Sequence, residues 1–158
     1  MISSISGVIK AVNPNAVVVD VGGVGMLIQV PNRVATTLKV GSAANFYTYL
    51  VVREDALNLF GFLELIDRDF FELLLSVTGI GPKVAQAILS GSDSSSIATA
   101  ISSGNLKTLE SFPGLGKKGA QRLVLELKDK VTAFASSNAN SNLSISNQVE
   151  NALQGMGY

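Results

Sequence analysis

Two nine-residue stretches of the sequence follow one pattern: residues 77–85 are Val-Thr-Gly-Ile-Gly-Pro-Lys-Val-Ala, and residues 112–120 are Phe-Pro-Gly-Leu-Gly-Lys-Lys-Gly-Ala. Each contains a glycine, an apolar residue and a second glycine, then basic residues, with an alanine at the fourth position after the second glycine. The opening glycines, Gly79 and Gly114, are 35 residues apart (114 minus 79). Apolar residues at helical spacing flank both stretches. The chain therefore contains a repeated turn between helices.

This pattern suits the binding of phosphate groups. Two glycines allow a tight turn with positive φ and leave no side chain between the backbone and a ligand. The helix that follows offers free N–H groups and a partial positive charge, and Pro82 fits its first position. Ile80 and Leu115 are expected to insert between the helices of their own turns. The pattern predicts a clamp that binds the nucleic-acid backbone irrespective of base sequence. The predicted contact residues are Gly79, Ile80, Gly81, Lys83, Gly114, Leu115, Gly116, Lys117, Lys118 and Arg122.

Two other interpretations of the glycines stand beside this one. A plain helical corner that needs glycine only for chain reversal explains a single copy equally well, but it does not explain matching basic residues in two copies. The segment from Gly114 to Gly119 also matches the G-x-G-x-x-G pattern of dinucleotide-binding folds. That motif follows a strand in a βαβ unit, whereas residues 105–112 have a helical pattern. Nicotinamide binding is therefore the weaker hypothesis.

Before the repeat, residues 1–62 have the pattern of β-strands. A β-branched run follows the turn signal at residues 13–15, and glycines at 22, 23 and 25 indicate a hairpin. The strand candidates are residues 5–9, 17–21, 26–30, 44–52 and 57–62. Five short strands predict a small barrel, for which the oligonucleotide-binding barrel is one candidate. From residue 64 the period becomes helical and predicts four or five short helices up to residue 134.

Composition excludes several classes of function. The chain has no Cys and no His, so disulfides, Cys/His zinc sites and Ser-His-Asp triads are impossible. The sequence gives little support for a nuclease that uses a carboxylate-bound metal, because it has no compact acidic cluster beyond Glu54 and Asp55. No apolar run approaches the ~20 residues that span a bilayer, and the start lacks a secretory signal, so we expect a cytoplasmic protein without membrane contact. Eight of the twelve Lys and Arg fall in residues 66–130, where an anionic partner is expected to bind.

At this point the residues resemble the RuvA family, the Holliday junction-binding subunits of the bacterial RuvABC branch-migration complex. The resemblance covers residues 1–134. Beyond the two glycine turns it rests on residues 21–25 (Val-Gly-Gly-Val-Gly), 51–56 (Val-Val-Arg-Glu-Asp-Ala), 59–62 (Leu-Phe-Gly-Phe), 87–91 (Ala-Ile-Leu-Ser-Gly) and 122–129 (Arg-Leu-Val-Leu-Glu-Leu-Lys-Asp).

The resemblance implies a β-then-α architecture. Residues 1–63 would form a five-stranded OB-fold barrel at the core of a tetramer, and residues 64–134 an all-α domain with tandem helix-hairpin-helix motifs. Residues 135–147, rich in Ser and Asn, would be a flexible linker, and residues 148–158 a truncated C-terminal helix left from the third, ATPase-binding domain. A single helix of that length cannot bury its own apolar face, so it would have to dock elsewhere.

The resemblance also implies a function in recombination and DNA repair. A homotetramer, or an octamer of two tetramers, would hold a Holliday junction open and square. The RuvB ATPase would drive branch migration, and the RuvC resolvase would cut the junction. The subunit itself would have no catalytic site, cofactor or metal. Glu54 and Asp55 would form an acidic pin near the tetramer axis.

The acidic pair has two interpretations. From the residues alone, Glu54 and Asp55 are a solvated turn. With the resemblance, four subunits would gather eight carboxylates that repel phosphates at the crossover. The chain departs from the family in its opening strand, where Ser3, Ser4 and Ser6 stand in place of basic residues.

A further alternative is a general duplex or single-strand binder that uses an aromatic barrel face. The aromatic residues concerned are expected in the core instead, and they are Phe46, Tyr47, Tyr49, Phe60 and Phe62.

Overall fold

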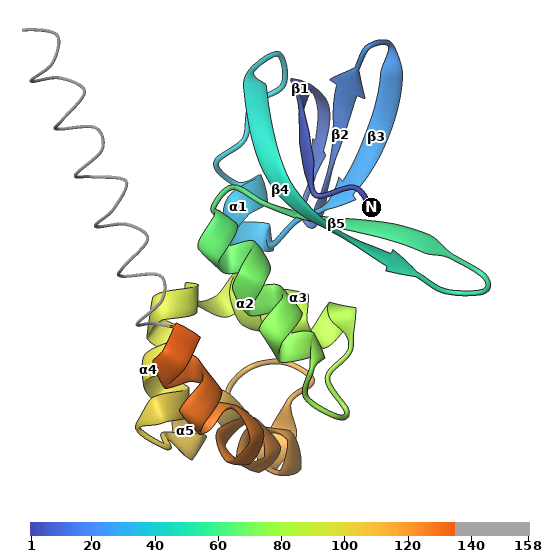
Figure 1. Ribbon diagram of the computed structural model, residues 1–158. Coiled ribbons are helices and arrows are strands. Elements are labelled where there is room, and N and C mark those ends of the chain that lie inside the picture. The colour runs from blue at the N-terminus through green and yellow to red at the C-terminus, as the bar shows by residue number, and fades with distance from the viewer. Residues whose placement is uncertain (135–158) are drawn as a thin grey trace, which may run out of the picture.

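The computed structural model describes residues 1–134, so the predicted linker (135–147) and C-terminal remnant (148–158) lie outside the described residues. Five strands lie at one end of the molecule with one short helix beside them, and the helices from residue 65 onward lie at the other end (Figure 1). Among residues 1–134, no helix has both the length and the apolar character needed to cross a membrane.

The strands form a closed barrel in the order β1-β2-β3-β5-β4, which confirms the predicted five-stranded barrel. All neighbouring pairs are antiparallel except β3 and β5, which pair in parallel. The elements are β1 (Ser4–Asn13), β2 (Ala16–Val21), β3 (Val24–Gln29), β4 (Ala43–Val52) and β5 (Leu57–Phe62), with the short helix α1 (Asn32–Ala35) between β3 and β4.

Alternation of side chains explains why these segments form a barrel. In β2, Val17 and Val19 are fully buried while the residues between and beside them are partly exposed. Gly22 and Gly23 form the two-residue turn into β3 with φ of 58° and 90°. Two successive positive φ values are typical of the hairpin turn whose twist matches that of the strands.

The second half consists of helices, as the change of period predicts. They are α2 (Leu65–Leu75), α3 (Pro82–Gly91), α4 (Ser94–Ser102), α5 (Leu106–Glu110) and a helical segment over residues 116–134. The last segment begins earlier than the apolar pattern at 122–130 indicates, because the glycine turn runs directly into it. Its buried residues recur at helical spacing and are Ala120, Leu123, Leu127 and Val131.

The barrel and the helices share apolar contacts. Phe60 and Phe62 of β5 belong to the hydrophobic cluster of the helical part, not to that of the barrel. Phe71 of α2 lies against both rings, with centroid distances of 5.1 Å to each, and against Tyr49 at 5.8 Å. The expectation that the barrel aromatics are core residues is confirmed for Phe46, Phe60 and Phe62, whereas Tyr47 and Tyr49 are only half-buried. Through Phe71, α2 packs against β4 and β5.

Candidate nucleic-acid interface

The first glycine turn, hairpin 1 (residues 77–85), links α2 to α3. Gly79 has a φ of +88°, a value that side-chain-bearing residues rarely adopt. The N–H of Ile80 donates to the carbonyl of Val77 at 3.1 Å, which closes the turn. Gly81 is the residue before α3, and Pro82 is the first residue of that helix, as predicted.

The second turn, hairpin 2 (residues 112–120), repeats this geometry. Gly114 has a φ of +83°, and the N–H of Leu115 donates to the carbonyl of Phe112 at 3.3 Å. Ile80 and Leu115 are each 7% exposed, so both are inserted between helices as expected. Because α5 and not a strand precedes hairpin 2, the surroundings of this turn differ from those that a dinucleotide-binding motif requires.

The start of α3 differs from the starts of α4 and α5, whereas α2 likewise begins without a capping side chain. Asp93 caps α4 by accepting from the N–H of Ser96, and Asn105 caps α5 by accepting from the N–H of Thr108. At α3, by contrast, no side chain of residues 1–134 forms such a cap. The first N–H groups of a helix have no intrahelical partner, so at hairpin 1 they remain available to an anion.

The predicted lysines surround these turns. Lys83, Lys117 and Lys118 are exposed. Ion pairs within residues 1–134 involve only Lys10, Arg33 and Arg68 among the basic residues. The three hairpin lysines therefore present ammonium groups that no carboxylate of the described chain neutralises.

Arg122 has a different position from the lysines. Its Nη1 donates to the carbonyl of Thr78 at 3.2 Å, and Glu126, one helical turn on, accepts from the N–H of Thr78 at 3.4 Å. Helix 116–134 is thereby joined to hairpin 1. A second contact joins α3 to hairpin 2. A Cβ added at Gly114 would lie 3.4 Å from Cγ2 of Val84 in α3. The structure brings the two hairpins together, and Arg122 is one of the links.

Glu54 and Asp55 lie at the tip of the β4–β5 hairpin. The N–H of Arg53 donates to the carbonyl of Ala56 at 2.9 Å and closes the turn. Both acidic side chains are exposed, and the hairpin projects from the side of the barrel (Figure 1). Sequence reasoning missed the flanking apolar pair, Val52 and Leu57, which is 66% and 70% exposed. The acidic pair thus stands on an arm, away from the glycine hairpins.

A groove of about 810 Å³ lies between the base of this arm and hairpin 1. Arg53 and Asn58 line it from the arm, and Lys83 and Gln86 line it from α3. Sequence reasoning also missed Arg53, Asn58 and Gln86 as lining residues. Of these three residues, only Arg53 had a signal in the sequence, namely its position beside the acidic pair. The groove runs from the predicted phosphate clamp to the base of the acidic arm, and its mixed polar and apolar lining includes the cations Arg53 and Lys83.

Comparisons with known proteins agree with this architecture. Residues 1–61 match the family described as RuvA N terminal domain, and residues 71–129 match the SAM-like Helix-hairpin-helix tandem. Three relatives are each named Holliday junction branch migration complex subunit RuvA.

Their coverage differs. The protein from Streptomyces coelicolor is 46% identical over 131 residues, which are 83% of this chain and 65% of the relative. Those from Herpetosiphon aurantiacus and Geobacter sulfurreducens are 44% identical over 163 residues and 40% identical over 166 residues. Each of these alignments covers the whole chain and 83% of the relative. The chain therefore belongs to the RuvA family.

Proposed function

We propose that this protein is a structure-specific DNA-binding subunit that recognises Holliday junctions and has no catalytic site of its own. The observation that carries the proposal is the duplicated hairpin, with the same turn geometry at Gly79 and Gly114 and, beside both, lysines that no carboxylate of residues 1–134 pairs. Two such clamps held together bind two stretches of phosphate backbone at fixed spacing. Recognition of this kind depends on the shape of the DNA and not on its base sequence.

The assembly we propose is a homotetramer, single or doubled into an octamer. One chain offers two hairpins, and a four-way junction presents four duplex arms. A four-fold ring would give each arm one pair of hairpins and would direct four copies of the acidic turn to the centre. There the carboxylates of Glu54 and Asp55 would repel phosphates and keep the crossover open and square.

The partners follow from the relatives' names, which place those proteins in a branch migration complex. We propose that a RuvB ATPase moves the arms while this protein holds the junction, and that the RuvC resolvase acts on the same junction. Residues 1–63 would supply the tetramer core and residues 64–134 the DNA contacts.

A gel-shift competition tests the central claim. A labelled four-way junction is mixed with excess linear duplex of the same sequences, in EDTA and at moderate salt. We expect the junction to remain bound while duplex competes poorly. Equal competition would mean that the hairpins bind any duplex, and the proposed roles of both the tetramer and the acidic turn would be wrong.

The acidic turn is tested by Glu54→Gln together with Asp55→Asn. Because both side chains are exposed, their loss should not disturb folding. Removing the repulsion should leave junction affinity unchanged or increase it, while the junction, followed by fluorescence of 2-aminopurine at the crossover, becomes less open. A collapse of binding would show that the pair supports the fold or a subunit contact instead.

A further inference from the structure

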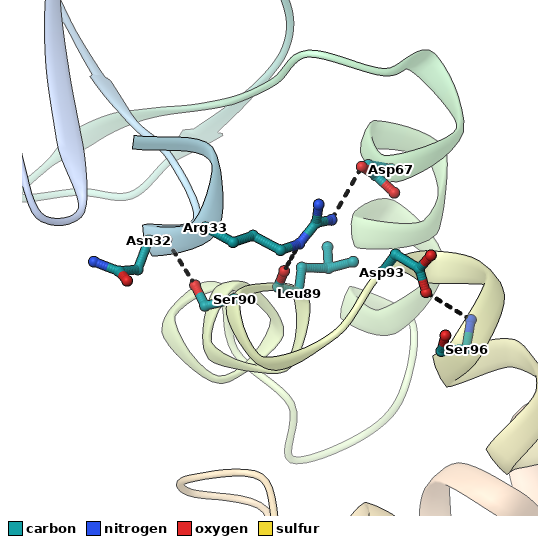
Figure 2. A network of polar contacts seen from close by, with 7 residues as sticks. All are labelled: Asn32, Arg33, Asp67, Leu89, Ser90, Asp93 and Ser96. Atoms are coloured by element: carbon teal, nitrogen blue, oxygen red, sulfur yellow. Dashed lines mark hydrogen bonds and ion pairs between the residues drawn. The ribbon is translucent and has the colours of Figure 1, made fainter. Parts of the chain in front are cut away.

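A polar network joins the barrel to the helices through α1, and the proposed function gives none of its side chains a role. Arg33 of α1 is at its centre, with the guanidinium directed toward the end of α3 and the start of α2 (Figure 2). Its Nε donates to the carbonyl of Leu89 at 2.6 Å. Its Nη2 donates to Oδ2 of Asp67 at 3.1 Å. One side chain from the barrel half thus contacts two helices.

The contact between α1 and α3 is reciprocal. The carbonyl of Leu89 lies in the last turn of α3, where carbonyls have no intrahelical partner and the helix carries partial negative charge. Arg33 satisfies that carbonyl with a cation. In return, Oγ of Ser90 accepts from the N–H of Asn32 at 3.0 Å. Asn32 is the first residue of α1, and this helix, which follows Pro31, has no capping side chain of its own. Each helix caps the other.

The ion pair is partly buried. The side chain of Asp67 is 8% exposed and that of Arg33 is 34% exposed. A carboxylate this buried is costly without its partner. Apolar contacts could hold the same surfaces together, but they have no preferred direction. A guanidinium that bonds a carbonyl and a carboxylate at once accepts only a narrow range of angles.

A second connection lies farther along α3. Nε2 of Gln86 donates to the carbonyl of Val30, the residue after β3, at 2.6 Å. Gln86 also lines the groove between hairpin 1 and the acidic arm. The helix that begins at hairpin 1 is therefore bonded to the barrel at its middle and at its end.

We propose that Arg33 is a positioning residue, which with Asp67, Ser90 and Gln86 fixes the angle between α3 and the barrel. We call these four residues the latch. Because hairpin 1 opens α3 and the barrel would form the core of the proposed tetramer, the latch sets where the hairpins of each subunit lie around that core. A junction needs all four pairs of hairpins in register with its arms, whereas a linear duplex needs only one pair. The inference rests on the proposed function and predicts that the latch determines junction preference, not duplex affinity.

The test uses the full chain with the double substitution Arg33→Met/Asp67→Leu, which removes both charges and leaves neither one buried alone. Arg33→Lys is a milder second variant, because lysine keeps the charge but lacks the rigid planar fork that spans both acceptors. The matched control is Lys10→Met, which breaks an ion pair between two strands on the surface of the barrel, from Lys10 Nζ to Asp20 Oδ2 at 3.7 Å.

Two readouts separate positioning from simple stabilisation. The first is the affinity for a four-way junction and for linear duplex, measured side by side. The second is the distance distribution between spin labels at Val40→Cys and Ser103→Cys, both exposed, with labelled chains diluted by unlabelled ones. The chain has no cysteine, so the labels are specific.

We expect the double variant to lose roughly tenfold in junction affinity, the effect of lost preorganisation, while duplex affinity stays within about twofold. The distance distribution should broaden, Arg33→Lys should fall between wild type and the double variant, and Lys10→Met should match wild type.

An unchanged distance distribution and junction preference in the double variant would overturn the proposal. So would a parallel loss of junction affinity, duplex affinity and thermal stability, which marks a purely structural pair. If the double variant does not fold, Arg33→Lys decides by the same criteria. Wild-type protein without junction preference would refute the proposed function instead, while the distance distributions would still report on the latch.

Discussion

Hairpin 1 and hairpin 2 share the turn around their first glycine but differ in their surroundings. Their first glycines share nearly the same φ, +88° and +83°, and their plug residues, Ile80 and Leu115, are equally buried. Hairpin 1 has one lysine and opens the helix that the barrel holds through hydrogen bonds from Arg33 and Gln86. Hairpin 2 has two adjacent lysines. The repeat shares the turn around its first glycine, and we propose that the remaining roles are divided, with hairpin 1 as the positioned clamp and hairpin 2 as the more strongly charged one.

The largest expected difference concerns charge. Lys117→Ala/Lys118→Ala should weaken junction binding more than Lys83→Ala, because it removes two cations from each subunit. Each neutralised phosphate contributes about 0.9 to the slope of log affinity against log salt. The slope should therefore become shallower by roughly 1.8 per subunit in the double variant and by about 0.9 in the single one. Titrations at several salt concentrations measure both.

A matched control is Lys39→Ala, an exposed lysine of the barrel half. It should leave the slope as in wild type. If the double variant at hairpin 2 left the slope unchanged, those lysines would not contact phosphates, and the division of roles between the hairpins would be wrong.

The second difference concerns the glycine after the plug residue. Gly116 has a φ of +64°, whereas Gly81 has an extended backbone with φ of −91°. An added Cβ meets no atom within 4 Å at either position, so only backbone conformation separates them. Gly116→Ala should lower the free energy of unfolding by about 1–2 kcal/mol.

At Gly81, alanine is a poorer N-cap residue than glycine, but it also restricts the unfolded chain. The two effects oppose each other, and Gly81→Ala should stay within about 0.5 kcal/mol of wild type. Urea unfolding of both variants measures this. Equal losses would mean that the second glycines serve the same purpose in both hairpins, and the asymmetry seen in φ would have no energetic meaning.

Patterns local to the chain predict most of this architecture. The β-branched run at 17–21, the turn at Gly22 and Gly23 and the change of period near residue 64 depend only on neighbouring residues, and the structure confirms the elements they predict. The hairpin repeat is equally visible, because a turn with positive φ favours glycine wherever it occurs.

Contacts between distant residues cannot be predicted in the same way. Arg33 and Asp67 are 34 residues apart, and Arg122 and Thr78 are 44 apart. Nothing in the local pattern of a surface helix indicates which carboxylate or carbonyl tertiary packing will bring to an arginine. Charge alone predicts Arg122 as a DNA contact, whereas its bond to hairpin 1 depends on how two helices cross. The latch depends on the same kind of information.

The smallest expected effect is on stability at acid pH, and it involves Asp93, the cap of α4, which lies near Arg33 of the latch. Hydrogen bonds from Ser96 hold the pKa of the Asp93 carboxyl below its usual value, and the nearby Arg33 cation lowers it further. The folded state therefore binds the proton less readily than the unfolded state. The stabilisation is complete above the unfolded pKa of about 3.9 and is lost as pH falls through the lower folded value.

Asp93→Asn keeps a capping side chain that cannot titrate, so its stability should fall less than that of wild type as pH falls below about 4. Because Asp93 is exposed, solvent screens most of the charge effect, and the difference should be small.

Arg33→Met in the wild-type background should raise the pKa of Asp93 toward its unperturbed value without restoring it, since the bonds from Ser96 remain. A carboxyl titration followed by NMR checks this. If the pKa of Asp93 did not respond to the loss of Arg33, the latch and the α4 cap would be electrostatically independent. Arg33 would then act through its hydrogen bond to Leu89 at the end of α3 and not through the effect of its charge on Asp93.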